Sequence, residues 1–141
     1  MENTKVLLVD DEPEFTATLA ERLATRELEV DVSDNGADAL SKVRDKNYDA
    51  VVLDMAMPGL DGIETLKLML EKNPDLQIIF LTGYATVEKS VEAIKLGAKD
   101  FLEKPVDIAA LYEKIKNAKV ERMILTEKKL EEKIKNIMTK K

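Results

Sequence analysis

The chain has 141 residues, a length typical of a single domain, and it contains neither cysteine nor histidine. These absences exclude disulfides, thiolate and imidazole metal ligands, and catalysis by a Ser-His-Asp triad. The net charge is −6, although residues 118–141 carry eight Lys or Arg against four Glu, so the rest of the chain is strongly acidic and unsuited to binding a nucleic acid backbone.

Short β-branched segments alternate with longer segments in which apolar residues recur every three or four positions, which predicts alternating strands and helices. In chain order, the predicted strands are 5–9, 30–32, 50–53, 77–81 and 100–102, and the helices between them are 13–26, 37–46, 62–72 and 86–96. Three of the strands are apolar on consecutive positions, which indicates burial on both faces. We therefore expect an α/β fold with a doubly wound, five-stranded parallel sheet.

A last helix is predicted from near Val106, and it shows no Gly or Pro that would end it. Its first apolar positions are spaced to pack on the sheet, whereas the later ones shift phase and continue beyond it: Met123, Leu130, Ile134 and Ile137, with Glu127 in the gap. We predict a domain over residues 1–118 and a helical extension over 119–141 that is a candidate coiled-coil segment for homodimer formation.

No apolar run is longer than five residues, which is too short to cross a bilayer. The N-terminal residues MENTKVLLVDDE contain no basic segment leading into an apolar one. We therefore expect no membrane association and a location in the cytoplasm.

Polar side chains follow four of the predicted strands: Asp10 and Asp11 the first, Asp54 the third, Thr82 the fourth and Lys104 the fifth. Sites in such sheets lie at the carboxyl ends of the strands, so these side chains should share one crevice. Neighbouring carboxylates repel one another, and an all-oxygen cluster suits Mg²⁺. With a lysine and a hydroxyl group nearby, the crevice suits a phosphoryl group carried on a carboxylate.

Four motifs carry a specific resemblance over residues 4–117: VLLVDDEP at 6–13, VVLDMAMPGLDG at 51–62, IIFLTGYA at 78–85 and GAKDFLEKP at 97–105. The chain resembles the receiver domains of two-component response regulators, and most of all those of sigma-54-type transcription activators. The resemblance implies a flavodoxin-like fold with strand order 2-1-3-4-5 and five helices. The effector modules of such activators are not in this sequence, and we expect either a stand-alone regulator or a fragment of a longer one.

The resemblance also implies a role for each residue of the crevice. Asp54 would accept a phosphoryl group from a histidine kinase or histidine phosphotransferase. Asp11 and Asp54 would bind Mg²⁺ directly, together with the backbone carbonyl of Ala56, and Asp10 would act mainly through metal-bound water. The chain would promote its own phosphorylation and dephosphorylation, and would not otherwise be an enzyme.

In the same family pattern, Thr82 and Lys104 would each contact a phosphoryl oxygen. Phe101 would move inward as Thr82 is drawn towards the phosphate, which would alter the surface formed by the fourth helix, fifth strand and fifth helix. A downstream protein would then recognise that surface.

Other interpretations compete with these assignments. Asp10, Asp11 and Glu12 could simply favour the start of the helix at Pro13, and Phe101 could be an ordinary core residue. GYATVEKS at 83–90 is not a phosphate loop, because Glu88 occupies the place of a required glycine. Ala56 lacks the carboxyl group that an aspartate-based phosphatase would use as its acid. A second hypothesis is that the chain acts mainly as a dimeric assembly module.

Overall fold

The computed structural model describes residues 4–55, 62–83 and 87–139. Strands and helices alternate as predicted, in the order β1 (Thr4–Val9), α1 (Pro13–Ala24), β2 (Leu28–Ser33), α2 (Gly36–Asp45), β3 (Ala50–Asp54), α3 (Gly62–Lys72), β4 (Ile78–Thr82), α4 (Val87–Lys95), β5 (Asp100–Glu103) and α5 (Ile108–Thr139). The last helix starts slightly later than predicted. The reason is Asp107, whose backbone carbonyl accepts the first helical bond from Leu111.

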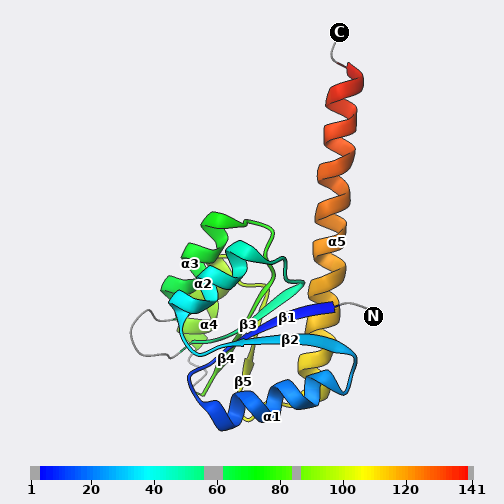
Figure 1. The fold of residues 1–141 in the computed structure, drawn as a ribbon. Coiled ribbons are helices and arrows are strands. Elements are labelled where there is room, and N and C mark those ends of the chain that lie inside the picture. The colour runs from blue at the N-terminus through cyan, green and yellow to red at the C-terminus, as the bar shows by residue number, and fades with distance from the viewer. Residues whose placement is uncertain (1–3, 56–61, 84–86, 140–141) are drawn as a thin grey trace.

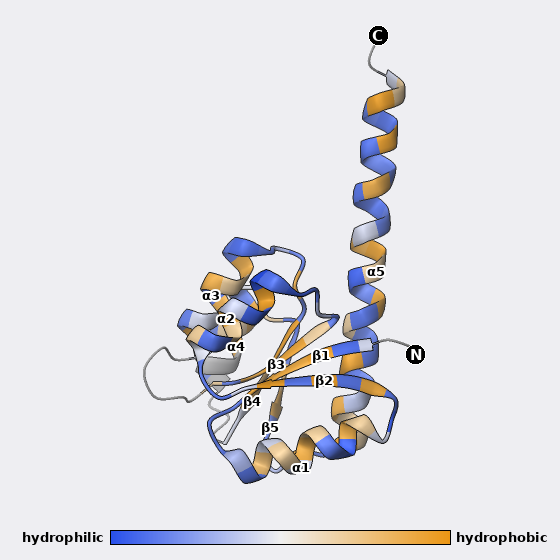
Figure 2. Ribbon diagram, in the orientation of Figure 1, coloured by the Kyte–Doolittle hydropathy of each residue, from blue (hydrophilic) through white to orange (hydrophobic). Residues whose placement is uncertain are grey.

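The five strands are parallel and lie in the order β2-β1-β3-β4-β5, which confirms the predicted doubly wound sheet. Helices α1 and α5 cover one face, and α2, α3 and α4 cover the other (Figure 1). Successive residues of β1 point to opposite faces, so Val6 and Leu8 pack with α1 and α5, whereas Leu7 and Val9 pack with the other three helices. Figure 2 shows the resulting apolar character of the central strands.

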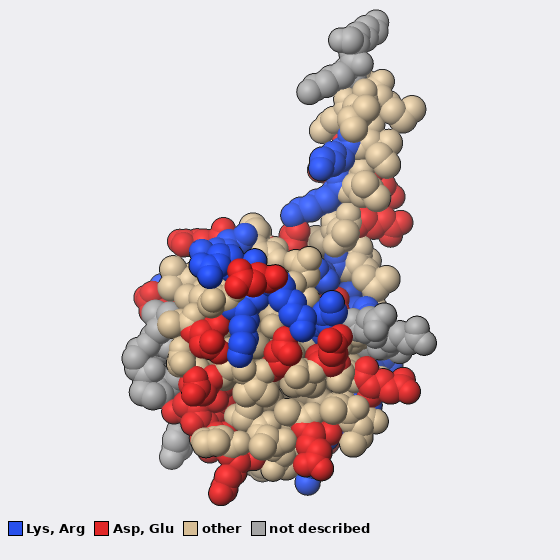
Figure 3. All heavy atoms as spheres, in the orientation of Figure 1, with Lys and Arg blue, Asp and Glu red and all other residues tan. Residues whose placement is uncertain are grey.

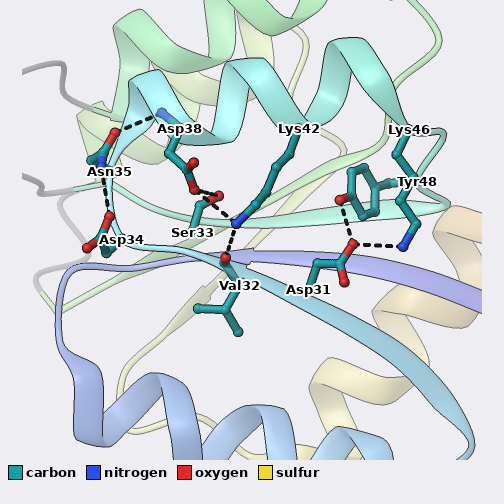
Figure 4. Close-up of polar contacts among 9 residues, drawn as sticks. All are labelled: Asp31, Val32, Ser33, Asp34, Asn35, Asp38, Lys42, Lys46 and Tyr48. Carbon is teal, nitrogen blue, oxygen red and sulfur yellow. Dashed lines mark hydrogen bonds and ion pairs between the residues drawn. The ribbon is translucent and has the colours of Figure 1, made fainter.

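Strand β2 forms one edge of the sheet, and polar side chains join it to α2 (Figure 4). Asp31 accepts hydrogen bonds from the Tyr48 hydroxyl at 2.7 Å and from the Lys46 ammonium at 2.8 Å. Burial, followed by the hydrogen bond to Asp31, raises the pKa of Tyr48 well above its ordinary value. Within α2, Lys42 pairs with Asp38 and also donates to the carbonyl of Val32. These contacts occupy backbone and side-chain groups along an edge that would otherwise be open to pairing.

Helix α5 has two parts with different surroundings. Leu111, Ile115 and Ala118 are buried against the sheet, and beyond them the helix projects past the body of the domain (Figure 1). Polar contacts hold the first turns of the projecting part: Arg122 donates to Asp49 at 2.8 Å, and Lys129 pairs with Asp75. Within the described ranges, no helix, this long one included, is apolar enough to cross a membrane.

Candidate functional site

Four predicted site residues meet at the carboxyl end of the sheet. Asp10 follows β1, while Asp54 and Thr82 are the last residues of β3 and β4, and all three are almost fully buried. Lys104 follows β5, and its backbone N–H donates to the Thr82 carbonyl at 2.8 Å. Its ammonium nitrogen lies 2.9 Å from Asp10 and 3.8 Å from Asp54. The short parallel strands therefore bring together residues that are up to 94 positions apart in the sequence.

Lys104 is the central cation of this site. Besides Asp10, its ammonium contacts the Glu12 carboxylate at 3.1 Å and lies 4.4 Å from the centre of the Phe15 ring. Desolvation by burial opposes the charged form of Lys104. The hydrogen bonds to Asp10 and Glu12 and the nearby charge of Asp54 outweigh it, so the pKa of Lys104 is raised above its ordinary value. Lys104 is therefore a fixed positive charge beside Asp54.

The carboxylate oxygens of Asp10, Glu12 and Asp54 lie within 4.8 Å of one another. Hard oxygen donors at this spacing fit a cation such as Mg²⁺. From the sequence, Glu12 was expected only to favour the start of α1. The Glu12 N–H donates to the Asp10 carboxylate at 3.0 Å. This hydrogen bond holds the turn after β1 so that the Glu12 side chain reaches Lys104. The acidic DDE run directly after a buried strand was the only sequence signal for it.

Two predicted metal ligands are not part of this group. Asp11 is exposed, and it does not belong to the group of carboxylates that lie within 4.8 Å of one another among the described residues. Ala56, whose backbone carbonyl was the other predicted ligand, lies outside the described residues. The direct metal contacts of Asp11 and Ala56 therefore stay predictions.

The two predicted switch residues come from neighbouring strands. Thr82 is buried at the end of β4, and Phe101 lies in β5, opposite Phe80 of β4. Phe101 is half-buried and packs against the core on the side of α2, α3 and α4. This position agrees with the core interpretation of Phe101, and its inward movement stays a prediction.

Gly62 places the start of α3 directly against the end of β3. A Cβ atom at this position would lie 2.7 Å from the Met55 Cα and 2.8 Å from the Asp54 carbonyl oxygen. The Gly62 N–H also donates to the Met55 carbonyl at 3.2 Å. The absence of a side chain at Gly62 thus lets a helix pack on the backbone that presents Asp54.

A groove of about 500 Å³ lies beside Lys104, between α1 and the segment that follows β5. Phe15 and Leu19 line it from α1, and Val106 and Ile108 line it from the opposite side. Its apolar walls border the polar site, so a protein surface docked there would lie next to Lys104.

A family model described as the response regulator receiver domain matches residues 6–116. The transcriptional regulatory protein ZraR of Klebsiella oxytoca is 40% identical over 110 residues, which are 78% of this chain and 25% of that protein. The C4-dicarboxylate transport transcriptional regulatory protein DctD of Pseudomonas aeruginosa is 38% identical over 129 residues, which are 90% of this chain and 28% of that protein. The chain therefore spans about a quarter of the length of these curated relatives.

Solved structures show the same fold. The response regulator protein TrrA of Thermotoga maritima, in complex with Mg²⁺ and BeF, is 35% identical, with a TM-score of 0.74. The match covers 84% of this chain and 99% of that chain.

Proposed function

The chain belongs to the response regulator receiver family, and we propose that Asp54 accepts a phosphoryl group from a phosphohistidine of a kinase or phosphotransferase. The observation that carries this proposal is the placement of Asp54. It is a buried carboxylate at the end of β3, and the ammonium of Lys104 and two further carboxylates lie around it. In the transfer, the bond from phosphorus to the imidazole nitrogen breaks as a bond to an Asp54 carboxylate oxygen forms.

The side chains of the site have separate tasks in this transfer. Lys104 neutralises charge on one phosphoryl oxygen, and the Thr82 hydroxyl donates a hydrogen bond to another. Asp11, Asp54 and the Ala56 carbonyl would hold Mg²⁺, and Asp10 would help through bound water. When bound, the metal supplies further charge neutralisation at the phosphoryl oxygens. The similar protein TrrA was solved in complex with Mg²⁺ and BeF, which supports a magnesium site in this fold.

The phosphoryl donor is proposed to be a protein, because the groove beside Lys104 offers apolar walls of protein-binding character. The chain acts as a phosphoacceptor that promotes its own phosphorylation and dephosphorylation, and it does not turn over separate substrates. After transfer, Thr82 moves towards the phosphate and Phe101 follows. This movement alters the surface of α4, β5 and α5 that a downstream protein recognises.

The test is incubation with acetyl phosphate and Mg²⁺, followed by intact mass measurement. The wild-type chain should gain the mass of one phosphoryl group, and Asp54→Ala should gain none. Asp45→Asn is the matched control, because Asp45 is an exposed acid at the end of α2, and it should be labelled like the wild type. Equal labelling of the wild type and Asp54→Ala would reject Asp54 as the acceptor.

A second candidate function is dimeric assembly through the extension of α5. The observation that favours it is the series of exposed apolar side chains on this extension, among them Met123 at 59% and Ile137 at 69% exposed. Sedimentation analysis of the full chain and of a chain ending at residue 118 tests this function. The full chain should dimerise and the shortened chain should not. If both chains sediment as monomers, the assembly function is rejected.

A further inference from the structure

Most of the exposed apolar residues of the α5 extension follow one seam, and Ile124 and Met138 lie outside it. We define the seam as the positions spaced alternately three and four residues apart: Val120, Met123, Glu127, Leu130, Ile134 and Ile137. Its five apolar members are between 48% and 69% exposed. Figure 2 shows separate apolar bands along this largely polar helix. This alternation is the spacing at which one helix pairs with another.

The body of the domain holds the opposite side of the same helix. Arg122 reaches Asp49, a residue almost buried at the start of β3, and Lys119 donates to Thr4 at 3.0 Å. Lys129 pairs with Asp75 about two turns beyond Arg122. At about 100° per residue, Arg122 and Lys129 point more than about 100° away from the middle of the seam, whereas Lys119 borders it. Figure 3 shows basic side chains gathered on the side of the extension nearer the body.

The ion pairs between the helix and the domain limit which surface can cover the seam. Because the ion pairs to Asp49 and Asp75 fix the direction of the helix, the seam faces away from its own domain and cannot fold back onto it. A second copy of the chain carries a seam with the same spacing. The occupant that fits the spacing is therefore this second copy, as the dimer proposed above requires.

Glu127 is the exception within the seam. It is exposed, and among the residues that the structure describes it makes no ion pair. In a parallel pair of helices, Glu127 would face Glu127 of the second copy, and in an antiparallel pair it would face Leu130. In both arrangements a carboxylate enters an apolar contact, which opposes association.

We propose that Glu127 limits the strength of the homodimer and keeps it in reversible equilibrium with the monomer. This inference rests on the dimer proposed above. Without a charge at this position, the seam would be six consecutive apolar layers and the dimer would be held by the extension alone. With Glu127 present, contacts elsewhere on the domain can shift the equilibrium, so the assembly stays adjustable.

Sedimentation equilibrium of the full chain tests the proposal with three variants. Glu127→Leu should tighten the dimer at least about a hundredfold, because two leucine side chains become buried in it. Glu127→Gln removes only the charge and should tighten it by a smaller factor. Glu132→Leu adds the same side chain on the other side of the helix, and its dissociation constant should equal that of the wild type.

The outcomes separate this inference from the dimer proposal itself. If the wild type dimerises but Glu127→Leu is no tighter, the role of Glu127 is wrong and the dimer stands. If Glu132→Leu tightens as much as Glu127→Leu, the gain reflects added apolar surface and the inference fails. If the wild type and all three variants remain monomers, the dimer proposal has failed.

Discussion

Lys104 reaches Asp54 across the end of the sheet, with its ammonium nitrogen 3.8 Å from a carboxylate oxygen. The same ammonium is closer to Asp10 and Glu12, so it is shared among three acids and is not committed to Asp54. Lys104 thus offsets only part of the charge of these three acids, and binding of a metal ion or a phosphoryl group would change its partners. The first two predictions follow from this sharing.

Replacing Lys104 should destabilise the domain, and the loss of stability should be larger without Mg²⁺ than with it. Lys104→Met should lower the free energy of unfolding by about 2 kcal/mol without Mg²⁺, because buried carboxylates lose their counter-charge. Mg²⁺ should restore more stability to this variant than to the wild type. Denaturant unfolding with and without Mg²⁺ measures both. Lys114→Met, which breaks a more exposed pair with Asp100, should show no such Mg²⁺ dependence, and an equal response would contradict the prediction.

The two acids after Asp10 should differ in their contribution to metal binding. Asp11→Asn should weaken Mg²⁺ binding at least about tenfold if Asp11 turns inward as a direct ligand. Glu12→Gln should weaken it only a few-fold, because Glu12 contributes charge from a largely exposed position. Calorimetric titration with Mg²⁺ compares the two variants. The reverse order would assign the ligand role to Glu12.

Close packing at Gly62 should make this position sensitive to a single methyl group. Gly62→Ala brings a Cβ within 3 Å of the backbone around Asp54, and should cost about 1–3 kcal/mol of stability and slow labelling by acetyl phosphate. Gly83→Ala is the matched control, since no described atom outside its own and the adjacent residues lies within 4 Å of its added Cβ. Unfolding and labelling measurements on both variants should show an effect at Gly62 alone. Similar effects at the two positions would contradict this account.

Asp31 should make part of the stability dependent on pH. Hydrogen bonds from Lys46 and then from Tyr48 lower the pKa of Asp31 below its ordinary value of 3.8. A carboxyl group with a lowered folded-state pKa stabilises the fold above its unfolded pKa, and this contribution is lost as the pH falls through the folded value. Asp31→Asn should therefore be less stable than the wild type at pH 7, and the difference should fade as the pH falls below the ordinary carboxyl pKa of 3.8. Unfolding free energies across this range measure it, and a constant difference would exclude the mechanism.

The sequence alone determined the fold and most of the site. Consecutive apolar residues in 50–53 and 77–81 required a sheet covered on both faces, and strand ends in a parallel sheet must share one edge. Asp10, Asp54, Thr82 and Lys104 could therefore be placed together from their positions after strands. The spacing of apolar residues and the positions at which strands end are local properties of the chain, which is why they could be predicted.

Tertiary structure decided the contacts that depend on where separate segments meet. That Lys104 contacts Glu12, and that Asp11 is exposed, depends on how the turn after β1 packs under the segment after β5. The apolar spacing of the α5 extension was visible in the sequence. Which side of that helix the body holds became known only from the pairing of Arg122 with Asp49. Such pairings join residues dozens of positions apart, and a spacing pattern within one segment contains no information about them.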